Sequence, residues 1–183
     1  MTQFEFITVA ISIVMALGVS RLLDALGPAL RPGSRSWIHV GWIAQKFFNH
    51  VLWWWTIWYI RDAEWNLGLF VFELVGPVIL YLQAAALAAP SEQSPLSWQD
   101  RFFEIRVPFF LGNLALVVIT LSAPSALFDT AQDVPTAPLV FLGALAIAGL
   151  ATRNIRAHML IVAVALGVQF VALGSAVFAI PNS

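Results

Sequence analysis

Three side chains that can gain or lose a proton, Lys46, His50 and Glu73, lie within stretches of otherwise apolar sequence. In an α-helix, Lys46 and His50 lie on one face, about 40° apart around the axis. His39, seven residues before Lys46, extends the same stripe. In apolar surroundings, such an amine, imidazole and carboxyl group can relay protons, bind an anion or bind a polar head group.

Glu73 offers a counter-charge on the next predicted helix, which follows a turn centred near residue 63. The antiparallel arrangement places position 73 level with position 53, one turn from His50. We therefore expect Glu73 to meet His50 directly, or Lys46 through the length of both side chains. Pro77, four residues after Glu73, has no backbone N–H to donate to the Glu73 carbonyl, so that carbonyl is left free beside the charged group. A purely structural ion pair between the two helices is the alternative interpretation.

Further amides extend this polar site. Asn49 widens the stripe around Lys46, as does Gln45. Asn113 and Gln169 reach the middle of two later helices, so we expect a polar layer near the middle of the bundle. Amides of this kind also hold helices together without any other function. The predicted site comprises Lys46, His50, Glu73, Asn49, Asn113 and Gln169.

A second group of polar residues lies closer to the helix ends. Arg21 and Asp24 are three residues apart, which permits a local ion pair. The alternative is a cytoplasmic vestibule that they share with His39 and His158. No catalytic residue, metal site or cofactor is predicted. Haem remains the alternative, because His39 and His158 lie at similar depth and imidazoles ligate haem iron.

Six apolar segments position these residues, and each approaches the length of about 20 residues that spans a bilayer. The long, continuous runs favour helices over strands. The sequence predicts an all-α membrane protein: a six-transmembrane-helix bundle forming one polytopic domain over residues 1–183. The expected helices are Phe4 to about Ala29, Trp37–Ile60, Leu67–Ala88, about Phe102 to Leu121, Pro138–Ala151 and His158–Ile180.

The composition points to lipid as the solvent of this chain. Of 183 residues, 60% are hydrophobic and 10% are charged, against about half and a quarter in soluble domains. A net charge of −1 without a basic cluster argues against nucleic acid as a partner. The first residues carry no Lys or Arg, so we interpret the first segment as a retained helix rather than a signal peptide.

Arginine residues predict the orientation in a plasma or bacterial inner membrane. Three alternate connections hold six of them, whereas the opposite side holds Arg61 alone. Positive residues concentrate on the cytoplasmic side, so both termini are expected on the non-cytoplasmic side. The six are Arg31, Arg35, Arg101, Arg106, Arg153 and Arg156.

Three classes of function fit these features. The first is a channel or transporter for protons, ions or a small polar solute that uses the Lys46 site. The second is an accessory or assembly subunit of a larger membrane complex, and the third is a redox protein that binds haem or quinone. The lipid bilayer is the expected environment, and a homo-oligomer or a membrane complex is the expected assembly.

Overall fold

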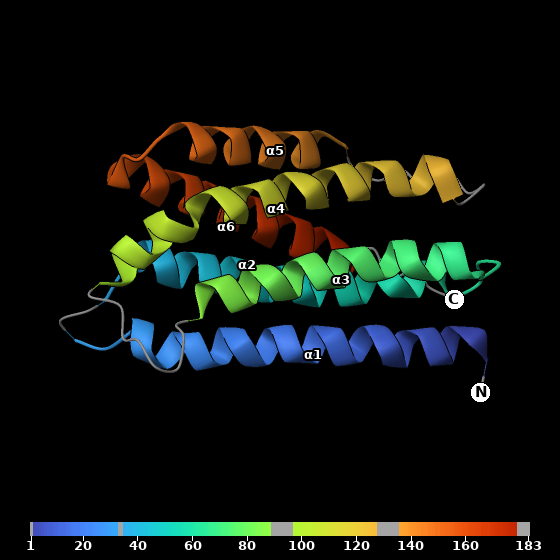
Figure 1. The fold of residues 1–183 in the computed structure, drawn as a ribbon. Helices are drawn as coiled ribbons and strands as arrows, with labels where there is room; N and C mark the ends of the chain where they lie inside the picture. Colours follow the sequence, from blue (N-terminus) through green and yellow to red (C-terminus); the bar gives the residue numbers. More distant parts are fainter. Residues whose placement is uncertain (1, 33–34, 89–96, 128–135, 179–183) are drawn as a thin grey trace.

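The computed structural model describes residues 2–32, 35–88, 97–127 and 136–178. Across these residues the regular structure is entirely helical, with six α-helices and one 3₁₀ turn (Figure 1). The predicted all-helical architecture of six helices is therefore confirmed. The elements are α1 (Gln3–Ala29), α2 (Trp37–Ile57), η1 (Trp58–Ile60), α3 (Leu67–Leu87), α4 (Trp98–Leu127), α5 (Thr136–Ala151) and α6 (Ile155–Phe178).

Side-chain caps set the first residues of several helices. The Oγ1 of Thr2 accepts the Glu5 N–H at 3.2 Å and the Glu5 carboxylate accepts the Thr2 N–H at 2.9 Å, which begins α1 with a capping box. The Oγ of Ser97 accepts the Asp100 N–H at 3.0 Å. This cap begins α4 at Trp98, four residues before the predicted start at Phe102. Helix α4 also ends at Leu127, six residues beyond the predicted Leu121, and the other predicted boundaries differ from the observed ones by up to three residues.

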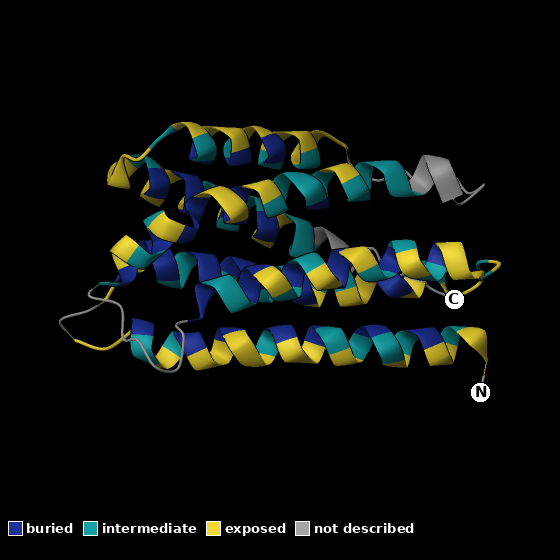
Figure 2. Ribbon diagram, in the orientation of Figure 1, coloured by how far each residue is buried: buried dark blue, intermediate teal, exposed yellow. Residues whose placement is uncertain are grey.

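Helix α2 is the central element of the bundle. It contacts α1, α3, α4 and α6, whereas α1 lies along one edge and α5 along the other (Figure 1). The ribbon segments of buried residues lie mainly on the sides of the helices that adjoin other helices, as along α1 (Figure 2). The most polar of the long helices is therefore enclosed by less polar neighbours.

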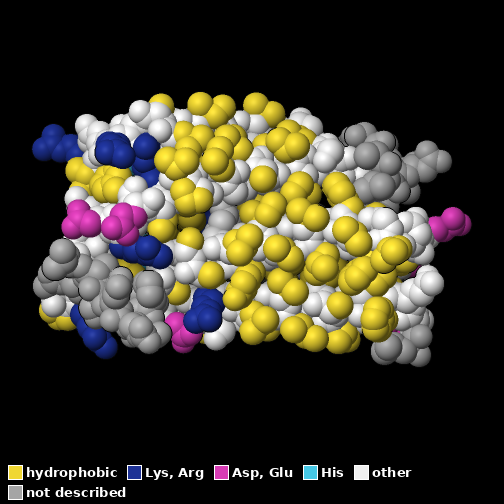
Figure 3. Space-filling model, viewed as in Figure 1, with side chains coloured by type: hydrophobic (Ala, Val, Ile, Leu, Met, Phe, Trp, Pro, Cys, Tyr) yellow, Lys and Arg dark blue, Asp and Glu magenta, His cyan; other side chains and the backbone are white. Residues whose placement is uncertain are grey.

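The outer surface of the bundle is apolar. Val9, Ile13 and Leu17 on α1 are each more than half exposed, and hydrophobic side chains cover much of the face in Figure 3. Patches of this extent mark contact with lipid or protein. Four helical segments are long and apolar enough to cross a membrane, namely Gln3–Ala29, Leu67–Leu87, Trp98–Ala123 and Ile155–Gly174. Helix α2 has enough residues to cross a membrane but is not apolar enough to count as a fifth such segment. Helix α5 is apolar but has too few residues.

Arg106 closes the end of α5 from the neighbouring helix α4. Its Nη1 donates to the carbonyl oxygens of Gly149 at 3.0 Å, Leu150 at 2.6 Å and Thr152 at 2.6 Å. The last carbonyls of a helix have no partner within it and attract cations. Arg106 was counted only as a loop charge from the sequence, but it is buried within α4 as a cap for α5.

Replacing the cap should destabilise the bundle. We predict that Arg106→Met lowers the free energy of unfolding by about 2–4 kcal/mol, because three buried or partly buried carbonyls lose a charged donor. Unfolding in mixed detergent micelles, followed by circular dichroism, measures this. The exposed Arg153→Met variant removes the same charge near the same end and should change stability by less than about 0.5 kcal/mol. Equal losses in the two variants would contradict the capping role.

Candidate functional site

Lys46 lies at the centre of the bundle with no exposed surface. Its Nζ donates to Oδ1 of Asn113 on α4 and lies 5.2 Å from the ring centroid of Phe109. The Nε2 of Gln83 on α3 donates to the same Asn113 oxygen at 2.9 Å, and to the Phe109 carbonyl at 2.8 Å. One amide oxygen thereby joins α2, α3 and α4. The Lys46 side chain therefore faces other helices and not the outside of the bundle.

The partners of Lys46 are neutral. Within the described part of the chain, the ion pairs join Arg61 to Asp62 and Arg101 to Glu104, both near helix ends. No described carboxylate lies within 4.0 Å of the Lys46 amine. The amine is held by an amide dipole and an aromatic face, so a structural ion pair does not account for it.

Glu73 is buried, but it pairs with neither Lys46 nor His50 among the described residues. The expected contact is therefore not formed. A helical side chain leans toward the N-terminus of its own helix. In the antiparallel pair α2 and α3, Lys46 leans away from the connecting turn and Glu73 leans toward it. The Trp53 ring fills the face of α3 beside Glu73, where a Cβ on Gly76 would lie 2.0 Å from Cζ2 of the indole.

His50 faces α1 rather than α3. Its Nδ1 donates to the carbonyl of Lys46 at 2.7 Å, one turn back on the same helix. Its Nε2 is buried and has no hydrogen-bond partner in the described structure. A Cβ on Gly18 of α1 would lie 2.3 Å from that nitrogen, so a glycine is what permits the imidazole to approach. His50 and Lys46 thus share a helix face but contact different neighbours.

A second amide network links α2 to α6. The Nε2 of Gln45 donates to Oδ1 of Asn49 and to Oε1 of Gln169, each at 3.2 Å. The sequence placed Gln169 and Asn113 in one polar layer with Lys46. The structure divides that layer, because Asn113 of α4 joins Lys46, whereas Gln169 of α6 joins Gln45, which also bonds Asn49.

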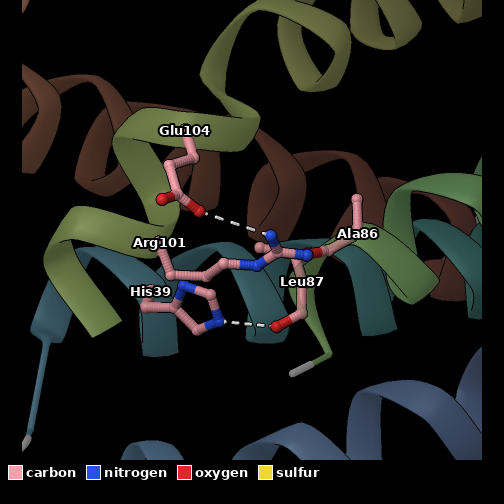
Figure 4. Close-up of polar contacts among 5 residues, drawn as sticks. All are labelled: His39, Ala86, Leu87, Arg101 and Glu104. Atoms are coloured by element: carbon pink, nitrogen blue, oxygen red, sulfur yellow. Dashed lines mark hydrogen bonds and ion pairs between the residues drawn. The ribbon is translucent and has the colours of Figure 1, made fainter. Parts of the chain in front are cut away.

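The four residues of the predicted vestibule do not gather in one place. Arg21 and Asp24 are exposed on α1, and the described ion pairs do not include them. His39 is buried, and its Nε2 donates to the Leu87 carbonyl at 2.8 Å (Figure 4). His158 is buried elsewhere, where its Nε2 donates to the Thr152 carbonyl at 3.0 Å. Both imidazoles therefore bind helix-end carbonyls.

The surroundings of these two histidines bear on the haem alternative. The His39 ring lies 4.7 Å from that of Trp98, and the His158 ring lies 5.2 Å from that of Phe102. Each imidazole packs against aromatic side chains, and no contact between His39 and His158 is recorded among the described residues. Haem binding stays an untested prediction.

Arg101 closes the end of α3 together with His39. Its Nη2 donates to the Ala86 carbonyl at 3.2 Å, and its Nη1 lies 3.5 Å from the carboxylate of Glu104 (Figure 4). Two adjacent carbonyls at the end of α3, Ala86 and Leu87, thus receive donors from α4 and α2. This cluster serves helix termination, whereas the Lys46 network lies away from any helix end.

Gln83 is the site residue that the sequence interpretation missed. Its amide lies on α3 within hydrogen-bond distance of Asn113, where Glu73 had been expected to supply the contact. Gly112 makes room for it, because a Cβ there would lie 2.7 Å from Nε2 of Gln83. The available signal was the single amide of this helix, a residue type that commonly joins membrane helices.

Comparison of this chain with protein-family models, with curated proteins and with solved structures finds no match. The functional argument therefore depends on the geometry of the site.

Because His50 approaches α1 closely, we predict that alanine substitutions at two glycines of α1 have opposite effects on stability. We expect Gly18→Ala to lower the free energy of unfolding by about 1–3 kcal/mol, because the new methyl group displaces a buried imidazole. Gly27 has open space around its Cβ position, so Gly27→Ala should raise stability by up to about 1 kcal/mol through helix propensity. Detergent unfolding curves of the two variants test the pair. A gain in both would show that His50 does not pack against Gly18.

Proposed function

We propose that this chain is a multi-pass membrane protein that moves a proton or small ion across the bilayer through the Lys46 site. The observation that carries the proposal is a fully buried amine whose described partners are neutral. Ionisable groups inside membrane helices are costly and are functional candidates by default. The apolar outer surface and the four helices long enough to span support the membrane location.

A purely structural role explains the amine less well. Structural burial of a charge is ordinarily compensated by an opposite charge and by full hydrogen bonding. Lys46 instead has an amide oxygen and the Phe109 ring as its recorded partners. Leucine or methionine at this position would remove the cost of burying an amine while keeping much of the volume. An amine retained in this environment is therefore best explained by exchange of a proton or an ion.

We further propose that all six helices cross the membrane, with both termini on the non-cytoplasmic side. Lys and Arg side chains gather at the end where α1 and α3 finish and α2 begins (Figure 3). The positive-inside preference makes this end cytoplasmic. Helix α2 is too polar to span alone, but its contacts with four other helices shelter its polar side chains.

Cysteine labelling tests this orientation cleanly, because the chain contains no cysteine. In cells that express the protein in a bacterial inner membrane, a membrane-impermeant maleimide should label Asp62→Cys from outside. It should label Arg153→Cys only after the membrane is opened. Both positions are exposed. The reverse pattern would overturn the proposed orientation, and equal external labelling of both would overturn the six-span topology.

Flux in proteoliposomes tests the transport proposal. One set of vesicles carries a pH-sensitive dye and a second set carries a dye that anions quench. With the wild-type protein, at least one of the two dyes should report flux. Lys46→Met should reduce that flux at least tenfold, because it removes the only ionisable group of the network that joins α2, α3 and α4.

Arg153→Gln is the matched control, since it removes one exposed positive charge outside this network and should leave the flux unchanged. Full flux in Lys46→Met, with correctly folded protein, would refute the site assignment. Absence of flux in the wild type, together with a stable co-purifying partner, would instead support an accessory subunit.

A further inference from the structure

The hydrogen-bonding groups around Lys46 contain more donors than acceptors. An ammonium has three N–H groups, of which one is directed to Asn113 Oδ1. The amide nitrogen of Asn113 donates to no described residue, since the recorded bonds of this side chain are both made by its oxygen. Oε1 of Gln83 is buried and has no described partner, and it is the one free acceptor of this network. The site therefore offers several hydrogen-bond donors and a positive charge to a bound ligand.

Trp42 adds a further donor on the same face of α2. It lies one turn before Lys46, and both the Trp42 ring and the Lys46 amine pack against the ring of Phe109. The indole is 2% exposed, and its N–H has no described partner. The Trp42 ring packs edge-on against Phe109 and Phe110, with centroids 5.1 and 5.4 Å apart. A buried indole N–H ordinarily finds an acceptor, and none of the described residues supplies one to Trp42.

We infer that the Lys46 site binds a small monovalent anion, held by the Lys46 ammonium, the Asn113 amide nitrogen and the Trp42 indole N–H. The inference rests on the proposed function and names the ion class of that site. One ammonium balances one negative charge, so the site selects monovalent over divalent anions. The close aromatic packing of Trp42, Phe109 and Phe110 favours an anion of a few heavy atoms. Asn113 is only partly buried.

Anion-dependent stability measures this binding without any transport assay. The purified protein in a nonionic detergent is titrated with sodium chloride, sodium nitrate or sodium formate, with sodium gluconate keeping the ionic strength constant. At least one of the three anions should raise the Tm in a saturable way, because a ligand that binds the folded state stabilises it. Exchange of sodium for choline should leave the effect unchanged. No saturable shift with any of the three anions would overturn the inference.

Two substitutions locate the binding. Lys46→Met should weaken the apparent affinity at least tenfold, whereas Lys46→Arg should retain saturable binding. Asn113→Asp keeps the shape of the side chain and places a carboxylate beside Lys46, so it should raise the Tm without added anion and abolish the anion response. This variant tests the site even if Lys46→Met does not fold. Thr120→Val, which removes a hydroxyl elsewhere on α4 that donates to the Leu116 carbonyl, should bind as the wild type does.

The outcomes separate this inference from the transport proposal. Saturable anion binding that depends on Lys46, without flux in vesicles, would support the binding site and refute transport. Proton flux that depends on Lys46, without any anion effect on the Tm, would support transport and refute the anion. An anion response that survives in both Lys46→Met and Asn113→Asp would overturn the assignment of the site.

Discussion

The arrangement of the bundle depends on a single amide oxygen, Oδ1 of Asn113, which accepts from both Lys46 and Gln83. These hydrogen bonds tie the central helix α2 to α3 and α4. Polar bonds between helices specify one register, because sliding a helix by one turn leaves buried groups without partners. The charged group is therefore both the most costly element of the interior and the one that fixes its register.

Sequence periodicity predicted that α2 buries a polar stripe and that Asn113 reaches the depth of Lys46, because helical spacing determines both. It did not predict which neighbour each residue contacts. His50 turns to α1 because Gly18 lacks a side chain, and Gln83 takes the place expected for Glu73. Which neighbour a side chain contacts depends on the direction of that side chain and on glycines in other helices that leave room for it. The hydrophobic pattern of one segment carries no information about either.

Arginines near the helix ends also show that the sequence predicts a residue's position better than its contacts. Counting Arg101 and Arg106 gave a charge bias for one side of the bundle, and both residues do lie toward that end. Their side chains, however, turn inward to the final carbonyls of α3 and α5. A helix end that is packed against protein needs donors from elsewhere, and a guanidinium group with several donors supplies them. The same residues thus contribute to charge asymmetry and to helix termination.

The brevity of α5 has a consequence for the surrounding lipid. Its 16 residues extend about 24 Å, whereas the hydrocarbon core of a bilayer is about 30 Å thick. Arg106 binds the carbonyl oxygens at its C-terminal end. With all six helices in the membrane, as proposed, lipids that border α5 must shorten or tilt, while those along the 27 residues of α1 need not. The bundle presents two edges of unequal height, which favours bilayers that are thin or that deform readily.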